Sequence, residues 1–134
     1  MDFEDIPQVD PNEAYRLVRE EGYVYLDVRT PEEFAAGHPA GAVLVPVLFR
    51  RPEGSYPNPR FVDEVKEKIP PGTSLVIGCR SGARSMTACR LLRQAGYPTV
   101  YNVRGGFAGK RDPWTGQLIE PGWQTLGLPV EEGD

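Results

Sequence analysis

The segment 74–77 constrains the fold more than any other, because Leu75, Val76 and Ile77 follow one another without alternating with polar side chains. A strand of this kind is buried on both faces, as in the centre of a parallel sheet. A glycine-containing loop follows at once, and then a helical pattern extends to about Ala95. A central strand that runs through a short loop into a helix is typical of an α/β fold.

The rest of the chain continues the alternation of β-rich runs and helical patterns. The further strands are expected at 6–9, 23–28, 43–45 and 99–103, and the further helices before Gly22, between Thr30 and Gly37, and from Arg60 to about Ile69. The Pro- and Arg-rich segment 50–59 is expected to be a loop. This order predicts a three-layer α/β fold, in which helices cover both faces of a mainly parallel, five-stranded sheet.

Length and charge restrict what the chain can be. We expect its 134 residues to form one domain, 1–134. A net charge of -4 argues against nucleic acid or an anionic membrane as the main partner. No apolar run approaches the roughly 20 residues that span a bilayer, and the acidic Met1–Asp5 does not resemble a secretory signal. The cytoplasm is therefore the expected compartment.

Cys79 is the strongest candidate for chemistry. Parallel sheets bind ligands beyond the carboxyl ends of their strands, and Cys79 follows such an end at the start of a helix. Helix N–H groups, the freedom of Gly82 and the charges of Arg80 and Arg84 should favour the thiolate and attract a small anion. The alternative is a buried structural cysteine. The residues expected to bind the substrate are Arg80, Ser81, Gly82, Ala83, Arg84 and Ser85.

The spacing between Cys79 and Arg84 and the scarcity of histidine restrict the reactions that the loop could catalyse. Four residues separate Cys79 from Arg84, whereas a cysteine-dependent phosphatase needs five to cradle a tetrahedral phosphate. A tighter ring of N–H donors suits a sulfur atom added to the cysteine. His38 is the only histidine, is far from Cys79 in sequence, and is expected to hydrogen-bond its local turn. Attack of a thiolate on sulfur needs no strong base, and neither a metal nor another cofactor is expected.

The sequence resembles the rhodanese family over nearly its whole length. The matching segments are Leu26-Asp27-Val28-Arg29, 33–38, Gly41-Ala42, Val45-Pro46, 79–85, Gly105-Gly106-Phe107 and 127–130. The resemblance implies that Cys79 takes sulfur from a small anionic donor such as thiosulfate and passes it to a thiol or protein acceptor. Its loop from Cys79 to Arg84 has the length of the family's sulfurtransferases, whereas a loop one residue longer marks the phosphatase relatives.

Two other functions remain open beside the enzyme. The domain could be a sulfur-relay or protein-binding module with little turnover, because the loop chemistry would be the same. A small-anion phosphatase or reductase is the third possibility, against which the short loop argues. The sequence does not predict the oligomeric state.

Segment 109–121 looks inserted relative to the family, and Pro39-Ala40 replaces a frequent Ile-Pro pair. The inserted segment follows the last strand, so it is expected near the mouth of the site. There Lys110, Arg111 and Trp114 could contact an acceptor. The equally weighted alternative is a surface excursion packed by Trp114.

Three further residues have weaker assignments. Asp27 and Arg29 lie at the carboxyl end of a strand and are candidates for the pocket rim, and Arg29 is expected to pair with Glu33. Cys89 could be imagined as a resolving thiol for Cys79. A position about seven residues along the helix, at 1.5 Å each, puts it roughly 10 Å away, beyond the reach of a disulfide. We therefore expect Cys89 to lie in the core.

Overall fold

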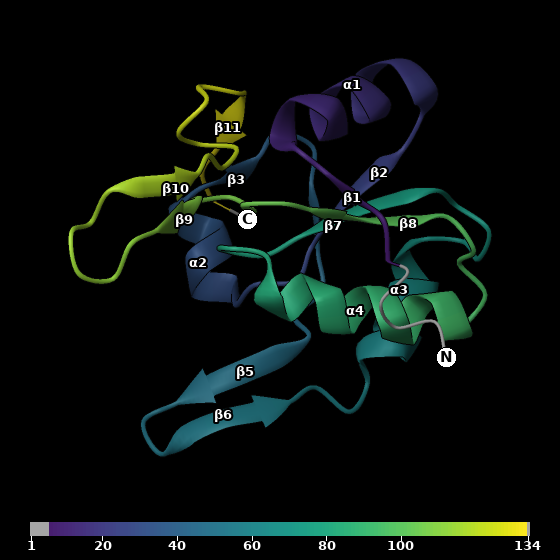
Figure 1. Ribbon diagram of the computed structural model, residues 1–134. Helices are drawn as coiled ribbons and strands as arrows, with labels where there is room; N and C mark the ends of the chain where they lie inside the picture. The colour runs from purple at the N-terminus through teal and green to yellow at the C-terminus, as the bar shows by residue number, and fades with distance from the viewer. Residues whose placement is uncertain (1–5, 134) are drawn as a thin grey trace.

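Five parallel strands form the central sheet of the computed structural model, which describes residues 6–133 (Figure 1). These strands are β1 (Gln8–Val9), β2 (Val24–Asp27), β4 (Val43–Leu44), β7 (Leu75–Gly78) and β8 (Val100–Val103). Their order is β1-β8-β7-β2-β4, and every neighbouring pair is parallel. The apolar β7 is therefore central, and the predicted parallel, five-stranded sheet is confirmed. The acidic segment Met1–Asp5 lies outside the described residues.

In the described part of the chain, four helices connect the strands, and two of them begin at caps visible in the sequence. They are α1 (Pro11–Glu21), α2 (Pro31–Ala36), α3 (Phe61–Lys68) and α4 (Ala83–Gln94). Asp10 caps α1 by accepting the Glu13 N–H at 2.8 Å. Thr30 and Glu33 form a reciprocal capping box on α2, which satisfies two backbone donors.

The helices cover both faces of the sheet. Ala14 of α1 packs against Val76 and Trp123 on one face. Ala88 of α4 and Val65 of α3 pack with Ile77 and its neighbours on the other. Figure 1 shows α1 on one side of the strands and α3 and α4 on the other. This arrangement confirms the predicted three layers and leaves the carboxyl ends of the strands as the open edge.

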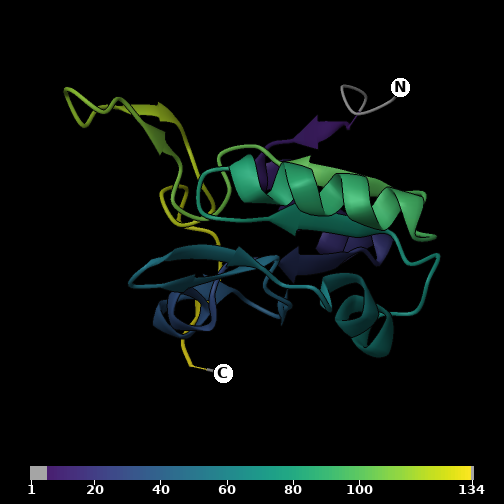
Figure 2. The same ribbon diagram turned by 90° about the horizontal axis from the view of Figure 1, so that it is seen from below.

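Two antiparallel hairpins project at that edge (Figure 2). The first consists of β5 (Leu48–Arg51) and β6 (Gly54–Pro57), so the prediction of a loop over 50–59 is wrong. It packs Leu48 against the core but leaves most of its side chains exposed, so it has no hydrophobic period to reveal it. A third, short pair joins β3 (His38–Pro39) to β11 (Val130–Glu131).

The second hairpin lies within the segment predicted to be inserted, 109–121. It consists of β9 (Lys110–Arg111) and β10 (Leu118–Glu120). Trp114, at its tip, is 93% exposed, so the alternative of an excursion packed by this side chain is wrong. Among residues 6–133, no helix is long and apolar enough to cross a membrane.

Candidate active site around Cys79

Cys79 follows the central strand directly and faces hydrogen-bond donors at the start of α4. The Gly82 N–H donates to Sγ at 3.1 Å, and the Ser85 N–H lies 3.4 Å from it. The Ser85 hydroxyl is also 3.4 Å from Sγ. Gly82 turns the chain at a φ of 112°, which only glycine adopts readily. Donors and the positive end of a helix together stabilise negative charge on sulfur.

The buried Asn102 supports Ser85 from behind. The Ser85 hydroxyl makes a short hydrogen bond to Asn102 Oδ1, and Asn102 Nδ2 donates to Gln8 Oε1 at 3.1 Å. Ser85 and Asn102 are almost fully buried. Sequence reasoning missed Asn102. The sequence feature that could have identified it is a polar residue inside a strand next to the central one, because a buried amide needs hydrogen-bond partners.

The glycine pair after β8 holds the backbone of the Cys79 loop. The Phe107 N–H donates to the Cys79 carbonyl at 2.8 Å, and the Ala108 N–H donates to the Arg80 carbonyl at 2.9 Å. Gly106 has a φ of 55°, and a Cβ there would lie 2.3 Å from the Cys79 carbonyl oxygen. No other residue fits without movement of the loop. Sequence reasoning used these glycines only as a family motif.

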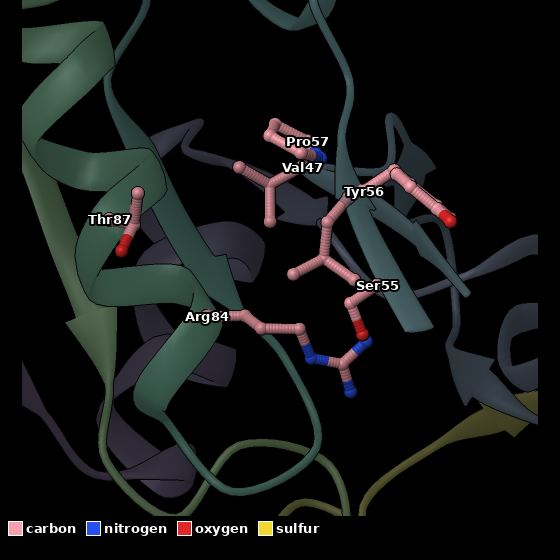
Figure 3. A pocket seen from close by; sticks show the side chains of 7 residues that line it. Val47, Ser55, Tyr56, Pro57, Arg84 and Thr87 are labelled. Atoms are coloured by element: carbon pink, nitrogen blue, oxygen red, sulfur yellow. The ribbon is translucent and has the colours of Figure 1, made fainter. Parts of the chain in front are cut away.

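Arg84 is paired with a carboxylate from another element. Its Nη1 and Nη2 donate to the two carboxylate oxygens of Glu33 at 2.8 and 3.0 Å. Burial opposes the charge of Glu33, but hydrogen bonds from Arg84 and Thr30 outweigh it and lower the pKa of Glu33 to about 2. Figure 3 shows the Arg84 side chain extending from α4 toward Ser55 of the β5–β6 hairpin, along a hollow lined mainly by apolar groups. The predicted anion-attracting charge of Arg84 is thus largely compensated.

The predicted pair of Arg29 with Glu33 is wrong, because Arg29 binds Asp27. Arg29 Nη2 lies 2.7 Å from Asp27 Oδ2, and a second bond of 2.7 Å reaches the Gly37 carbonyl. Residues two apart at a strand end point to the same side, which brings these charges together. The Arg29 guanidinium also lies 4.4 Å from the centre of the Phe107 ring. Both side chains are buried, and Arg29 also lines a hollow beside the loop.

Arg80 is the exposed cation of the loop. Within residues 6–133 its guanidinium has no carboxylate partner within salt-bridge distance. It lines two adjoining hollows, of about 360 and 270 Å³, the first with Arg29 and Phe107 and the second with Ser81 and Lys110. A third hollow, of about 350 Å³, reaches Ser81, Gly82 and Ala83. Of the predicted loop residues, Arg80, Ser81, Gly82 and Ala83 therefore line these hollows. Arg84 lines the separate hollow beside the β5–β6 hairpin, and Ser85 is buried.

Cys89 and His38 have the structural positions expected of them. Cys89 is fully buried in the core beneath α4, and burial raises the pKa of its thiol to about 12. It forms no disulfide with Cys79. His38 Nδ1 lies 2.7 Å from the Phe34 carbonyl, and the two rings stack. In the described part of the chain, no group of three His, Cys, Asp or Glu side chains could hold a metal ion.

Comparison with known proteins gives one consistent family. The model of the rhodanese-like domain matches residues 10–111. Thiosulfate sulfurtransferase 18 of Arabidopsis thaliana is 40% identical over 106 residues, which cover 78% of this chain and 77% of that protein. The senescence-associated protein DIN1 of Raphanus sativus is 37% identical, but the match covers 95% of this chain and only 62% of the relative.

A solved structure agrees. The crystal structure of Rv0390 from M. tuberculosis superimposes with a TM-score of 0.78 at 30% identity, over 95% of this chain and 98% of that one. This chain therefore belongs to the family of rhodanese-like domains.

Proposed function

We propose that this protein is a sulfurtransferase in which Cys79 carries a sulfane sulfur as a persulfide. The Cys79 thiolate attacks the outer sulfur of thiosulfate and forms a bond to it. The sulfur–sulfur bond of thiosulfate breaks, and its electron pair leaves on sulfite. A nucleophile, cyanide in an assay or a thiol in the cell, then attacks the outer sulfur and returns the electron pair to Cys79 Sγ.

The observation that carries the proposal is the set of donors around Cys79 Sγ. The Gly82 N–H and the Ser85 N–H lie 3.1 and 3.4 Å from it, at the N-terminus of α4. Fixed donors of this kind stabilise a thiolate before the reaction and the sulfur anion after it. Attack of a thiolate on sulfur needs no strong general base.

The charges around the loop support an anionic donor. Glu33 compensates Arg84, and Asp27 compensates Arg29. Arg80 is left as the exposed charge beside two hollows. We assign to Arg80 the attraction of the donor, and to Arg84 the bracing of the loop against α2.

Intact mass spectrometry tests the proposal. After incubation with thiosulfate, the protein should gain about 32 Da, the mass of one sulfur atom, and lose it on reduction. The variant Cys79→Ser should show no gain, while Cys89→Ser should gain the same mass as the unmodified protein. No gain in the unmodified protein, or a gain that survives Cys79→Ser, would contradict the proposal.

A working thiolate also bears on the compartment. Both cysteines are free, and a persulfide carrier must avoid oxidation to a disulfide or sulfinic acid. This supports a reducing compartment such as the cytoplasm.

A further inference from the structure

The β9–β10 hairpin is a structured arm. Lys110 pairs with Glu120 across its two strands. At its turn, Asp112 Oδ1 accepts the backbone N–H groups of Trp114 and Thr115 at 2.7 and 3.0 Å. These bonds fix the turn, so that the arm presents its tip in a defined place.

The base of the arm is joined to the Cys79 loop. The Gly109 N–H donates to the Gly105 carbonyl at 2.7 Å. The two ends of the arm touch there, since a Cβ on Gly122 would lie 2.2 Å from Gly109 N. The neighbouring residue, Ala108, donates to the Arg80 carbonyl at 2.9 Å. The position of the arm is therefore set relative to the Cys79 loop.

The outer part of the arm presents apolar side chains to water. Trp114 is 93% exposed, Ile119 55% and Leu118 37%. A tryptophan is one of the residues that most often dominate protein–protein binding energy, and it is normally well buried. Trp114 at the tip of the projecting hairpin is therefore a candidate contact for a partner protein.

The base of the arm is basic. Lys110 and Arg111 are exposed and line a hollow with Arg80 and Ser81. Arg104 joins Lys110 in the adjoining hollow, where Glu120 is the carboxylate. The chain as a whole carries a net charge of -4, so this cluster is opposite in sign to the rest of the molecule. It would attract an acidic surface and orient it toward the loop.

We propose that the β9–β10 hairpin docks a protein sulfur acceptor, whose acidic surface around its thiol lies on Lys110 and Arg111 and whose apolar surface covers Trp114. This inference rests on the proposed function, because it names the class of acceptor for the same persulfide. In the transfer step, the acceptor thiolate attacks the outer sulfur of the Cys79 persulfide. The bond from Sγ to that sulfur breaks, Sγ keeps the electron pair and takes up a proton, and the acceptor leaves as a persulfide anion.

Two synthetic peptides serve as the probes. Both have one cysteine and a leucine, and they differ in whether glutamates or lysines flank the cysteine. The protein is first loaded with sulfur from thiosulfate, and the loss of about 32 Da on adding each peptide gives a transfer rate. We expect the acidic peptide to react roughly tenfold faster at low ionic strength, with the difference shrinking as salt is added.

Variants assign this preference to the arm. Lys110→Ala/Arg111→Ala should remove the preference for the acidic peptide, whereas Lys66→Ala/Lys68→Ala should keep it. The control changes the charge equally on α3, on the opposite side of Figure 1 from the arm. Trp114→Ala should slow transfer to both peptides about fivefold by removing an apolar contact, while transfer to cyanide remains within twofold.

Equal rates for the two peptides, or a preference that survives loss of Lys110 and Arg111, would overturn the proposal. Docking is also measured without sulfur transfer, with peptides that carry serine in place of cysteine. The chain has two tryptophans, and Trp123 is only 2% exposed, so the emission of exposed Trp114 should change when the acidic peptide binds. If the protein fails to load with sulfur but binds this peptide, the proposed chemistry is wrong and the docking surface stands. If the emission change is the same for both serine peptides, the docking surface is wrong.

Discussion

The guanidinium of Arg84 is held by the carboxylate of Glu33, 51 residues earlier, with Nη1 and Oε1 2.8 Å apart. The bond joins the end of the Cys79 loop to the first turn of α2. Glu33 also accepts the Thr30 N–H at 3.0 Å, as part of the helix cap. One carboxylate thus ties the loop to the start of a helix that follows a different strand.

Replacing Glu33 with glutamine should lower the free energy of unfolding at pH 7 by as much as about 3 kcal/mol, since one pKa unit corresponds to about 1.4 kcal/mol. Glutamine retains the cap, so the loss reports mainly on the ion pair. Urea unfolding measures it. The control is Glu67→Gln, which removes the exposed 2.8 Å pair with Arg60 and should cost at most about 0.5 kcal/mol.

The same pair predicts a dependence of stability on pH. The pKa of Glu33 in the folded protein, about 2, is below its ordinary value of 4.5. Its contribution is therefore complete above pH 4.5 and is lost as the pH falls toward 2. The difference in unfolding free energy between the unmodified protein and Glu33→Gln should shrink over this range. A difference that stays constant down to pH 2 would show that the ionised carboxylate is not the cause.

Replacing Gly106 with alanine should displace the Cys79 loop. The new Cβ would lie 2.3 Å from the Cys79 carbonyl oxygen, in addition to adopting a φ of 55°. Gly116→Ala is the matched control, because Gly116 also has a positive φ, 73°, but open space around its Cβ position. The control should lower the free energy of unfolding by about 1 kcal/mol. Gly106→Ala should lower the free energy of unfolding, measured in urea, clearly more than the control does, and it should slow sulfur loading. Equal losses of stability in the two variants would contradict the close approach of Gly106 to Cys79.

Ser85→Ala should slow sulfur loading by roughly tenfold, the effect of one hydrogen bond to a charged sulfur. It also leaves the buried oxygen of Asn102 without its hydroxyl partner, which should cost about 1–3 kcal/mol of stability. The rate of mass gain from thiosulfate and urea unfolding measure the two effects. Thr87→Ala removes an exposed hydroxyl from the same helix and should change neither. Unchanged loading in Ser85→Ala would remove this hydroxyl from the mechanism.

Cys89 should remain unmodified while Cys79 reacts. Burial raises the pKa of the Cys89 thiol to about 12, so its thiolate is scarce at pH 8. Cys79 is itself only 2% exposed, but its Sγ faces the N–H donors at the start of α4. Peptide mapping after brief treatment with iodoacetamide should therefore find Cys79 labelled at least about tenfold faster than Cys89 in the native protein. Both cysteines should be labelled after unfolding in urea. Comparable labelling in the native state would show that the core beneath α4 opens readily.

Local patterns in the sequence determined the elements that carry the site. The apolar run before Gly78 predicted the central strand, because only a strand buried on both faces lacks polar alternation. Thr30, Pro31 and Glu33 predicted the start of α2, since a helix cap involves residues within a single turn. The Cys79 loop, its glycine and its two arginines were likewise visible as neighbours in the chain.

Only the tertiary structure decided which groups meet. Arg29 forms its ion pair with Asp27, and Arg84 forms its ion pair with Glu33. The partner of each charge depends on how the strand ends and helices lie relative to one another. The contact of Asn102 with Ser85 joins residues 17 apart on different elements. The two hairpins bury little, so no hydrophobic period marked them. Packing brings distant segments together. It left Arg80 as an exposed cation with no carboxylate partner among residues 6–133, and it placed the β9–β10 arm beside it.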